Sequence, residues 1–223
     1  MKDPFTEEQS DLIKHLTIHS ILFCGFFFLL EYRYGLDHEL AVFLSFFLLP
    51  FCYLVIFEYL TLEKVKDSII STLRSFGTID LGFFEGLAIY LIFSVYILIY
   101  AIRDPEFFDD YDKIGRALAV SLFITALNVI PIDFFTKRII QYSLMERFPP
   151  RTVILLTTIV WLLAHIPESL WLNELMGNIG VWIFLLFSGL ITSISYQRTK
   201  NVWGQMSGHV LLNFMVALFA HYL

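Results

Sequence analysis

The stretch PIDFFTKRII, residues 131–140, decides how the chain is interpreted, because it places charges inside an apolar segment. Asp133, Lys137 and Arg138 fall within two helical turns of a sequence that otherwise is typical of a lipid-facing helix. Ionisable groups in the hydrocarbon of a bilayer cost at least a few kcal/mol each, so they are functional candidates by default. We therefore expect this helix to face a hydrated cavity, with Asp133 directed inward and the basic pair near the cytoplasmic mouth.

The composition of the 223-residue chain is that of an integral membrane protein. Hydrophobic residues make up 57% of the chain and charged residues 16%, against about 25% charged in a typical soluble domain. The apolar residues come in long runs, which predicts an all-α fold, a polytopic bundle of membrane helices. The acidic N-terminus lacks the basic region of a secretory signal peptide, so we expect the first run to remain as an anchor. Cys24 and Cys52 lie in apolar runs and are interpreted as small core residues, with no disulfide or metal framework.

The length of the apolar runs sets the number of spans. A helix needs about 20 apolar residues to cross the hydrocarbon, and by that measure the sequence contains about seven. The fifth is short before Pro167 and could continue beyond it with a kink. We divide the chain into N-terminal membrane helices with a cytoplasmic amphipathic loop, residues 1–116, and core helices, residues 117–223. The predicted spans are Leu16–Tyr32, Glu39–Leu60, Gly82–Ile102, Ala117–Tyr142, Thr152–Ile166, Ile179–Tyr196 and Val202–Leu223.

Basic residues between the spans predict the orientation. The side richer in Lys and Arg is expected to be cytoplasmic, which puts the N-terminus inside and the C-terminus outside. On the cytoplasmic side, the segment 62–77 has the pattern of an amphipathic helix lying on the membrane surface. The richer side collects Lys2, Lys14, Lys64, Lys66, Arg74, Arg147, Arg151, Arg198 and Lys200, and the other side collects Arg33, Arg103, Lys113 and Arg116.

Polar residues of three spans are predicted to lie at compatible depths. Asp133 and His165 each stand 14 residues from an end of the cytoplasmic turn at 147–151, so both should lie ~20 Å from that turn. His209 and Asn213 share one face of the last span, ~10–17 Å from the inner surface. A carboxylate and a His can polarise a water, while a second His and an Asn stabilise an oxyanion. The four residues therefore suit water activation in one cavity.

Each of these residues also has a purely structural interpretation. An intramembrane His or Asn is often only an interhelical hydrogen-bonding group. Lys137 and Arg138 could extend to the cytoplasmic interface, and Asp133 could exist only to pair with Lys137, one turn along. Glu168 follows His165 by three residues, and a helix kinked at Pro167 could direct both into the cavity.

Three short motifs occur in order in the last four spans: DFFTKR at 133–138, WLLAH at 161–165 and HVLLN at 209–213. Together they resemble the CPBP family of intramembrane proteases, which includes the type II CAAX prenyl endopeptidases and the Abi bacteriocin-immunity proteins. The family pattern is EExxxR, then FxxxH, then HxxxN or HxxxD. The resemblance covers about residues 117–223.

The resemblance implies an intramembrane endopeptidase acting on a membrane peptide or a lipidated protein. By the family pattern, Asp133 and His165 would activate water, His209 and Asn213 would hold the oxyanion, and Arg138 would be the structural Arg. The family's enzymes are regarded as glutamic and not metal-dependent, so no cofactor or metal is implied. We expect the substrate and the lipid bilayer as partners, and no nucleic acid.

The first motif departs from the family pattern, because Asp133 and Phe134 replace its paired Glu. Asp is one methylene shorter than Glu, and a misplacement near 1 Å can cost about 100-fold in rate. Phe134 removes the carboxylate that would stand one turn before Arg138. Lys137 is then the supporting residue that could hold Asp133 instead.

Several functions therefore stay open at the level of sequence. The chain is either an endopeptidase or an inactive relative that binds a membrane partner, in peptide immunity or as a chaperone. Two His and one carboxylate could also form a facial metal site, and an Asp–His relay could serve a small transporter. No inverted repeat supports the transporter. In a protease, Asp133→Ala and His165→Ala should abolish cleavage, whereas an inactive relative should keep its effect in both variants.

Overall fold

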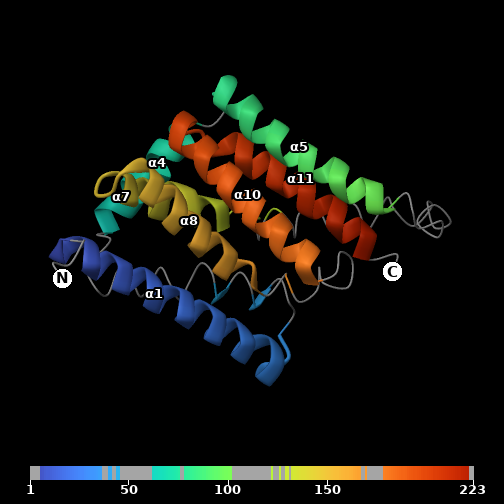
Figure 1. Cartoon of the computed structure of the whole chain (residues 1–223), viewed down its shortest axis with the longest axis horizontal. Helices are drawn as coiled ribbons and strands as arrows, with labels where there is room; N and C mark the ends of the chain where they lie inside the picture. The colour runs from blue at the N-terminus through green and yellow to red at the C-terminus, as the bar shows by residue number, and fades with distance from the viewer. Residues whose placement is uncertain are drawn as a thin grey trace.

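The computed structural model describes residues 6–36, 40–41, 44–45, 62–75, 78–101, 122, 126, 129–130, 132–166, 169 and 178–220. Within these residues the regular elements are helices, with no strand, so the all-α prediction is confirmed for this part of the chain (Figure 1). The elements are α1 (Glu7–Phe28), the π-helix η1 (Leu29–Arg33), α4 (Leu62–Arg74), α5 (Leu81–Ala101), the π-helix η5 (Phe134–Gln141), α7 (Tyr142–Met145), α8 (Pro150–Ala164), α10 (Asn178–Thr199) and α11 (Trp203–Ala220).

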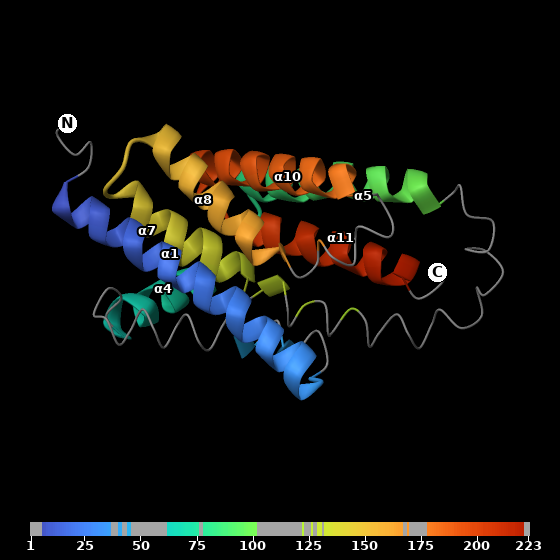
Figure 2. The ribbon, with the colours of Figure 1, turned by 60° about the horizontal axis from the view of Figure 1, so that its bottom comes forward.

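The helices pack as a bundle in which α5, α10 and α11 lie side by side (Figure 1). Helix α8 packs against α10, and α1 packs against α8. The η5 segment lies between α8, α10 and α4, so it is enclosed by helices from both halves of the chain. Figure 2 shows α1, η5 with α7, α8 and α10 following one another across the bundle.

Local sequence explains where several helices begin. Thr6 and Gln9 form a reciprocal capping box at the start of α1, and Glu7 lies in its first turn, where a negative charge complements the helix dipole. Helix α8 begins with Pro150, whose missing N–H costs nothing in the first turn. Asn201 precedes α11 and accepts from the backbone N–H of Trp203 at 3.0 Å, as an N-cap residue does.

Glycines allow α5 and α11 to approach closely. A Cβ on Gly204 would lie 2.1 Å from the carbonyl oxygen of Phe83, and one on Gly208 would lie 2.6 Å from Tyr90 Cβ. On α5, a Cβ on Gly86 would lie 2.6 Å from a backbone nitrogen of α11. Glycines four residues apart are typical of closely packed membrane helices. This glycine seam, Gly82, Gly86, Gly204 and Gly208, holds the start of α11 against α5.

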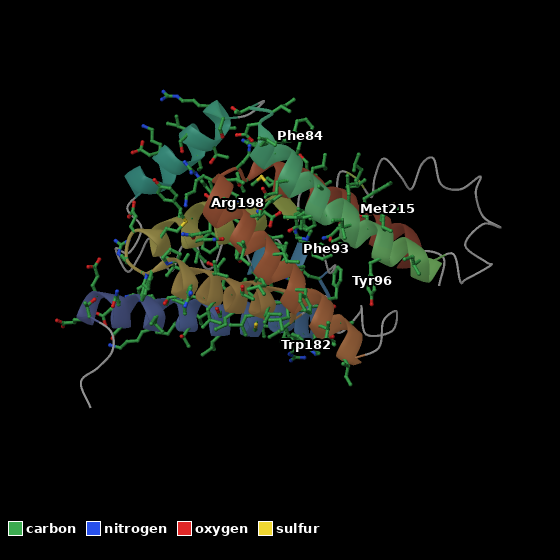
Figure 3. All side chains as sticks on the ribbon, turned by 45° about the horizontal axis from the view of Figure 1, so that its top comes forward. Phe84, Phe93, Tyr96, Trp182, Arg198 and Met215 are labelled. Atoms are coloured by element: carbon green, nitrogen blue, oxygen red, sulfur yellow. The ribbon has the colours of Figure 1, made fainter. Side chains whose placement is uncertain are left out.

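The bundle exposes large apolar side chains, and its interior combines a hydrophobic core with buried polar side chains. Phe84 on α5 and Trp182 on α10 are exposed on the outside, whereas Phe93 and Tyr96 of α5 contact Phe184 of α10 (Figure 3). Large exposed apolar side chains continue along α1, α5 and α10, which is the surface expected next to lipid rather than water. The buried polar side chains include Asp133, Thr136, Lys137, Gln141, Thr157, Thr192, Ser193, Gln205 and His209.

Two helices in the described part of the chain are long and apolar enough to cross a membrane, namely Glu7–Arg33 and Ile179–Thr199. They contain the first and sixth predicted spans. Two shorter apolar helices, Leu81–Tyr96 and Pro150–Ala164, fall in the third and fifth. Most of the second predicted span and 11 of the 26 residues of the fourth lie outside the described residues, so the number seven stays a prediction.

One end of the bundle brings together chain segments that are distant in sequence. Arg147, in the turn before α8, forms an ion pair with Glu8 of α1 at 2.8 Å. Lys200, between α10 and α11, donates to Met145 Sδ at 3.2 Å. Arg33 is the last residue of η1, so it lies at the opposite end of the first helix from Glu8. Of the basic residues predicted for the other side, the described part of the chain includes Arg33, so the separation of the two groups along the bundle stays a prediction.

Candidate active site

Asp133 lies immediately before η5 and is completely buried. Its Oδ2 lies 3.1 Å from His209 Nδ1 on α11, a contact between residues 76 positions apart. Its Oδ1 is buried and receives no hydrogen bond from any described residue. Because a buried carboxylate oxygen without a partner is costly, this oxygen is suited to accept from a water or a substrate group.

His165 follows the last residue of α8, where the helix ends. Its Nδ1 lies 2.8 Å from the carbonyl oxygen of Trp161. Since a carbonyl only accepts, we assign the Nδ1 proton to this bond, which leaves Nε2 of the neutral ring as an acceptor. The ring lies 4.1 Å, centroid to centroid, from that of Trp161.

His209 contacts both Asp133 and the ring of His165. Its ring lies 5.8 Å from that of His165, at an interplanar angle of 25°. Tyr90 of α5 stacks on His209 at 4.9 Å and 11°, and the ring of Trp161 lies 5.2 Å away. Asp133, His165 and His209 therefore form one buried cluster, which we call the carboxylate–imidazole cluster.

The predicted fourth member, Asn213, is not hydrogen-bonded to this cluster. It lies one turn after His209 on α11, as expected, and is half-buried. Among the described residues its amide makes no hydrogen bond. The structure thus brings three of the four predicted residues into contact and leaves Asn213 on the adjacent turn.

The η5 segment that follows Asp133 is a π-helix of eight residues. Such i→i+5 turns are rare and occur frequently at functional sites. Two of its side chains attach it to α10: Lys137 Nζ donates to Ser193 Oγ at 2.9 Å, and Gln141 Nε2 donates to the Ser193 carbonyl at 2.8 Å. These bonds fix the helix that carries Asp133.

The two basic residues of the motif differ in position. Lys137 is fully buried and lies over the Trp161 ring at 5.0 Å, so the interpretation that it extends to the membrane surface is wrong. In the described part of the chain Lys137 forms no ion pair with Asp133, so the interpretation that the two residues pair directly is also wrong. The partner of Lys137 is Ser193, which lies within reach on α10. Arg138 is half-buried and donates to Ser71 of α4 at 2.6 Å.

The aromatic residues of the site were not identified from sequence. Trp161 lies one turn before His165 in the same motif, so its position beside that ring could have been predicted from helical spacing. Tyr90 lies in a different span, and no motif links it to His209.

Glu168 and Pro167 lie outside the described residues. Within the described residues no three His, Cys, Asp or Glu side chains converge as metal ligands.

The fold and the site define a class: helical proteins with an apolar exterior and a buried carboxylate–imidazole cluster. Within that class, residues 114–215 match the family described as type II CAAX prenyl endopeptidase Rce1-like. The match confirms the resemblance to the CPBP proteases, and it contains every predicted site residue. Proteins of this family are membrane-embedded, in agreement with the apolar helices of the bundle. No curated protein and no solved structure matches the chain significantly.

Proposed function

We propose that the chain is a membrane-embedded endopeptidase that hydrolyses a peptide bond of a lipidated or membrane-anchored substrate. The observation that carries the proposal is the buried contact between Asp133 and His209 beside the ring of His165. A carboxylate and two imidazoles are the groups that general acid–base hydrolysis requires. They come from three separate elements within the segment that matches the Rce1-like family.

In the proposed reaction, a water bonds to Asp133 Oδ1 and His165 Nε2. One of these groups takes a proton as the water oxygen attacks the substrate carbonyl carbon. The resulting oxyanion accepts hydrogen bonds from the Asn213 amide and from Nε2 of His209, which donates in the doubly protonated form of the ring while Nδ1 donates to Asp133. The C–N bond then breaks, and the retained proton passes to the leaving amine, which regenerates the site.

Asp133 can serve in place of the family's Glu because His209 holds it. Its Oδ2 is fixed by His209 Nδ1 at 3.1 Å, so the orientation of the carboxylate is set without the second carboxylate that Phe134 replaces. Phe134 is half-buried and packs against the hydrophobic core, and it takes no part in this contact. We expect the shorter side chain to lower the rate through imperfect placement of water, and not to remove the chemistry.

We further propose a multi-pass arrangement with the N-terminus cytoplasmic and the C-terminus outside. The contacts of Arg147 with Glu8 and of Lys200 with Met145 support it, because they gather the basic segments at one end of the bundle. An excess of Lys and Arg is typical of cytoplasmic segments. The site would then be entered from the cytoplasmic side.

The test is cleavage of a quenched, membrane-anchored peptide library by the purified chain in proteoliposomes. Wild type is compared with Asp133→Ala and with the double variant Asp133→Glu/Phe134→Glu. Cleavage by wild type that disappears in Asp133→Ala supports the proposal. Cleavage by the double variant alone would identify a scaffold that has lost its chemistry and acts by binding, and would contradict the proposal for this chain.

A further inference from the structure

Lys137 is an ammonium enclosed in the interior of the bundle. Its side chain is among the largest that are completely buried. Its Nζ donates to Ser193 Oγ at 2.9 Å and lies 5.0 Å from the centre of the Trp161 ring. No carboxylate oxygen of a described residue lies within 4.0 Å of it. A hydroxyl and a ring face alone compensate a buried charge poorly.

The opposite charge is supplied by the same segment of chain. Asp133 stands four residues before Lys137 on the same segment and is equally buried, so the two charged groups share one interior. The basic neighbour Arg138 is directed to Ser71 on α4. Among the described Asp and Lys side chains, Asp133 and Lys137 are the ones that are completely buried, and His209 is the basic group in direct contact with the carboxylate.

The contacts of Lys137 with Ser193 and Trp161 hold its ammonium apart from the Asp133 carboxylate, so the two groups do not form a direct ion pair. The bond to Ser193 holds Lys137 Nζ on α10, while His209 holds Oδ2 of Asp133. Oδ1 therefore stays free of the ammonium. A direct pair would occupy the oxygen that the proposed reaction needs for water.

We infer that Lys137 is a positioning residue: it is the buried counter-charge of the Asp133 carboxylate, held by Ser193 so that Oδ1 of Asp133 stays open. This inference rests on the proposed function and deepens it, because it assigns the residue that balances the charge of the proposed base Asp133 while leaving its Oδ1 accessible to water. The equivalent place in the family motif carries no charge requirement, so the role belongs to this chain's own sequence.

The test is a double-mutant cycle on the melting temperature of the purified full chain, which requires no substrate. Lys137→Met leaves the carboxylate without its counter-charge and should lower the melting temperature by roughly 5–10 °C. On the Asp133→Asn background the same substitution should lower it by less than half as much. Equal losses on both backgrounds would overturn the inference, since they would show that Lys137 acts only through packing.

Two further variants separate charge from helix attachment. Lys137→Arg keeps the charge, so its melting temperature should lie close to that of wild type. Ser193→Ala removes the hydrogen bond to Lys137 and should lower the melting temperature by the same amount on the wild-type and the Asp133→Asn backgrounds. Where Lys137→Met yields no folded protein, recovery of folded protein in Asp133→Asn/Lys137→Met supports the inference, and failure of both overturns it. A chain that shows this coupling but cleaves nothing would contradict the proposed function alone.

Discussion

At the scale of single residues, the two imidazoles differ in what depends on them. His165 Nδ1 is bonded to the carbonyl of Trp161, whereas His209 Nδ1 is bonded to the buried carboxylate of Asp133. Removing His209 would leave a carboxylate oxygen without its partner. Removing His165 would leave only a helix-end carbonyl. Substitution of His165 should therefore affect activity but not stability, whereas substitution of His209 should affect both.

We predict that His165→Gln lowers kcat by about 10²–10⁴-fold with little change in melting temperature. His209→Ala should lower both the activity and the stability, the latter by about 2 kcal/mol, because it leaves a buried charged acceptor unpaired. Peptide cleavage and thermal unfolding of the two variants, measured in the same detergent, check this. Equal destabilisation by both substitutions would contradict the difference between the two partners.

A second residue-scale prediction concerns Asp80, at the start of α5. The backbone N–H of Phe83 and the side chain of Asn201, both at 2.8 Å from Oδ1, hold the pKa of Asp80 below its usual value. A lowered pKa gives stability that is present above the unfolded value, about 4, and is lost as the pH falls through the folded value.

The melting temperature of Asp80→Ala should therefore lie below that of wild type at pH 6, and the difference should shrink as the pH falls toward 3. Because Asp80 also links the starts of α5 and α11, Thr78→Ala in the same loop serves as a control that leaves the carboxylate in place. A difference that stays constant with pH would show that the ionised form is not involved.

The structure shows how far single residues could be predicted from the sequence. The proximity of Asp133 and His165 was expected from their equal distances to a turn, and that of His209 from its depth in the last predicted span, because the rise per residue is nearly constant in helices. The partner of Lys137 was not, because Ser193 lies 56 residues away and a lone Ser carries no signal. A contact fixed by the packing of two helices is visible only in three dimensions.

At the scale of elements, the η5 π-helix is the feature that the sequence could not predict. Residues 134–141 are as compatible with an α-helix, since both forms use the same side-chain preferences and differ in hydrogen-bond register. Helix α4, by contrast, was expected from its amphipathic pattern and is observed over Leu62–Arg74. Its position on the membrane surface stays a prediction.

The glycine seam supports a prediction at this scale. Gly208→Ala places a Cβ 2.6 Å from Tyr90 Cβ, so α5 and α11 must separate, at a cost of about 1–3 kcal/mol. Gly25→Ala in α1 is the matched control, because nothing lies within 4 Å of its Cβ, and it should be neutral or slightly stabilising. We expect Gly208→Ala alone to lower both the melting temperature and the cleavage rate, since Tyr90 stacks on His209.

At the scale of the whole molecule, the exposed apolar surface and the buried polar interior fit a bundle enclosed by lipid. The composition of the sequence predicts a membrane protein. A chain of 223 residues of which 57% are hydrophobic cannot bury all of them in its own interior. The family match covers residues 114–215, yet α5, which lies before it, contributes Tyr90 to the site. The site therefore belongs to both halves of the chain.

The orientation can be checked with single cysteines in a chain that lacks Cys24 and Cys52. Tyr34 and Arg151 are both exposed and lie near opposite ends of the bundle. We predict that a membrane-impermeant maleimide labels Tyr34→Cys in intact cells, and labels Arg151→Cys only after lysis. The reverse pattern would invert the proposed topology, and equal labelling of both in intact cells would contradict a span formed by the first helix.

The contact between Asp133 and His209 also has a consequence for biosynthesis. The ribosome delivers Asp133 76 residues before His209 and Lys137 56 residues before Ser193. In the proposed multi-pass arrangement, the carboxylate and the ammonium would therefore enter the bilayer before these hydrogen-bonding partners have been synthesised. Translation intermediates that end before α11 should consequently be the ones retained by the insertion machinery and most sensitive to membrane-protein quality control.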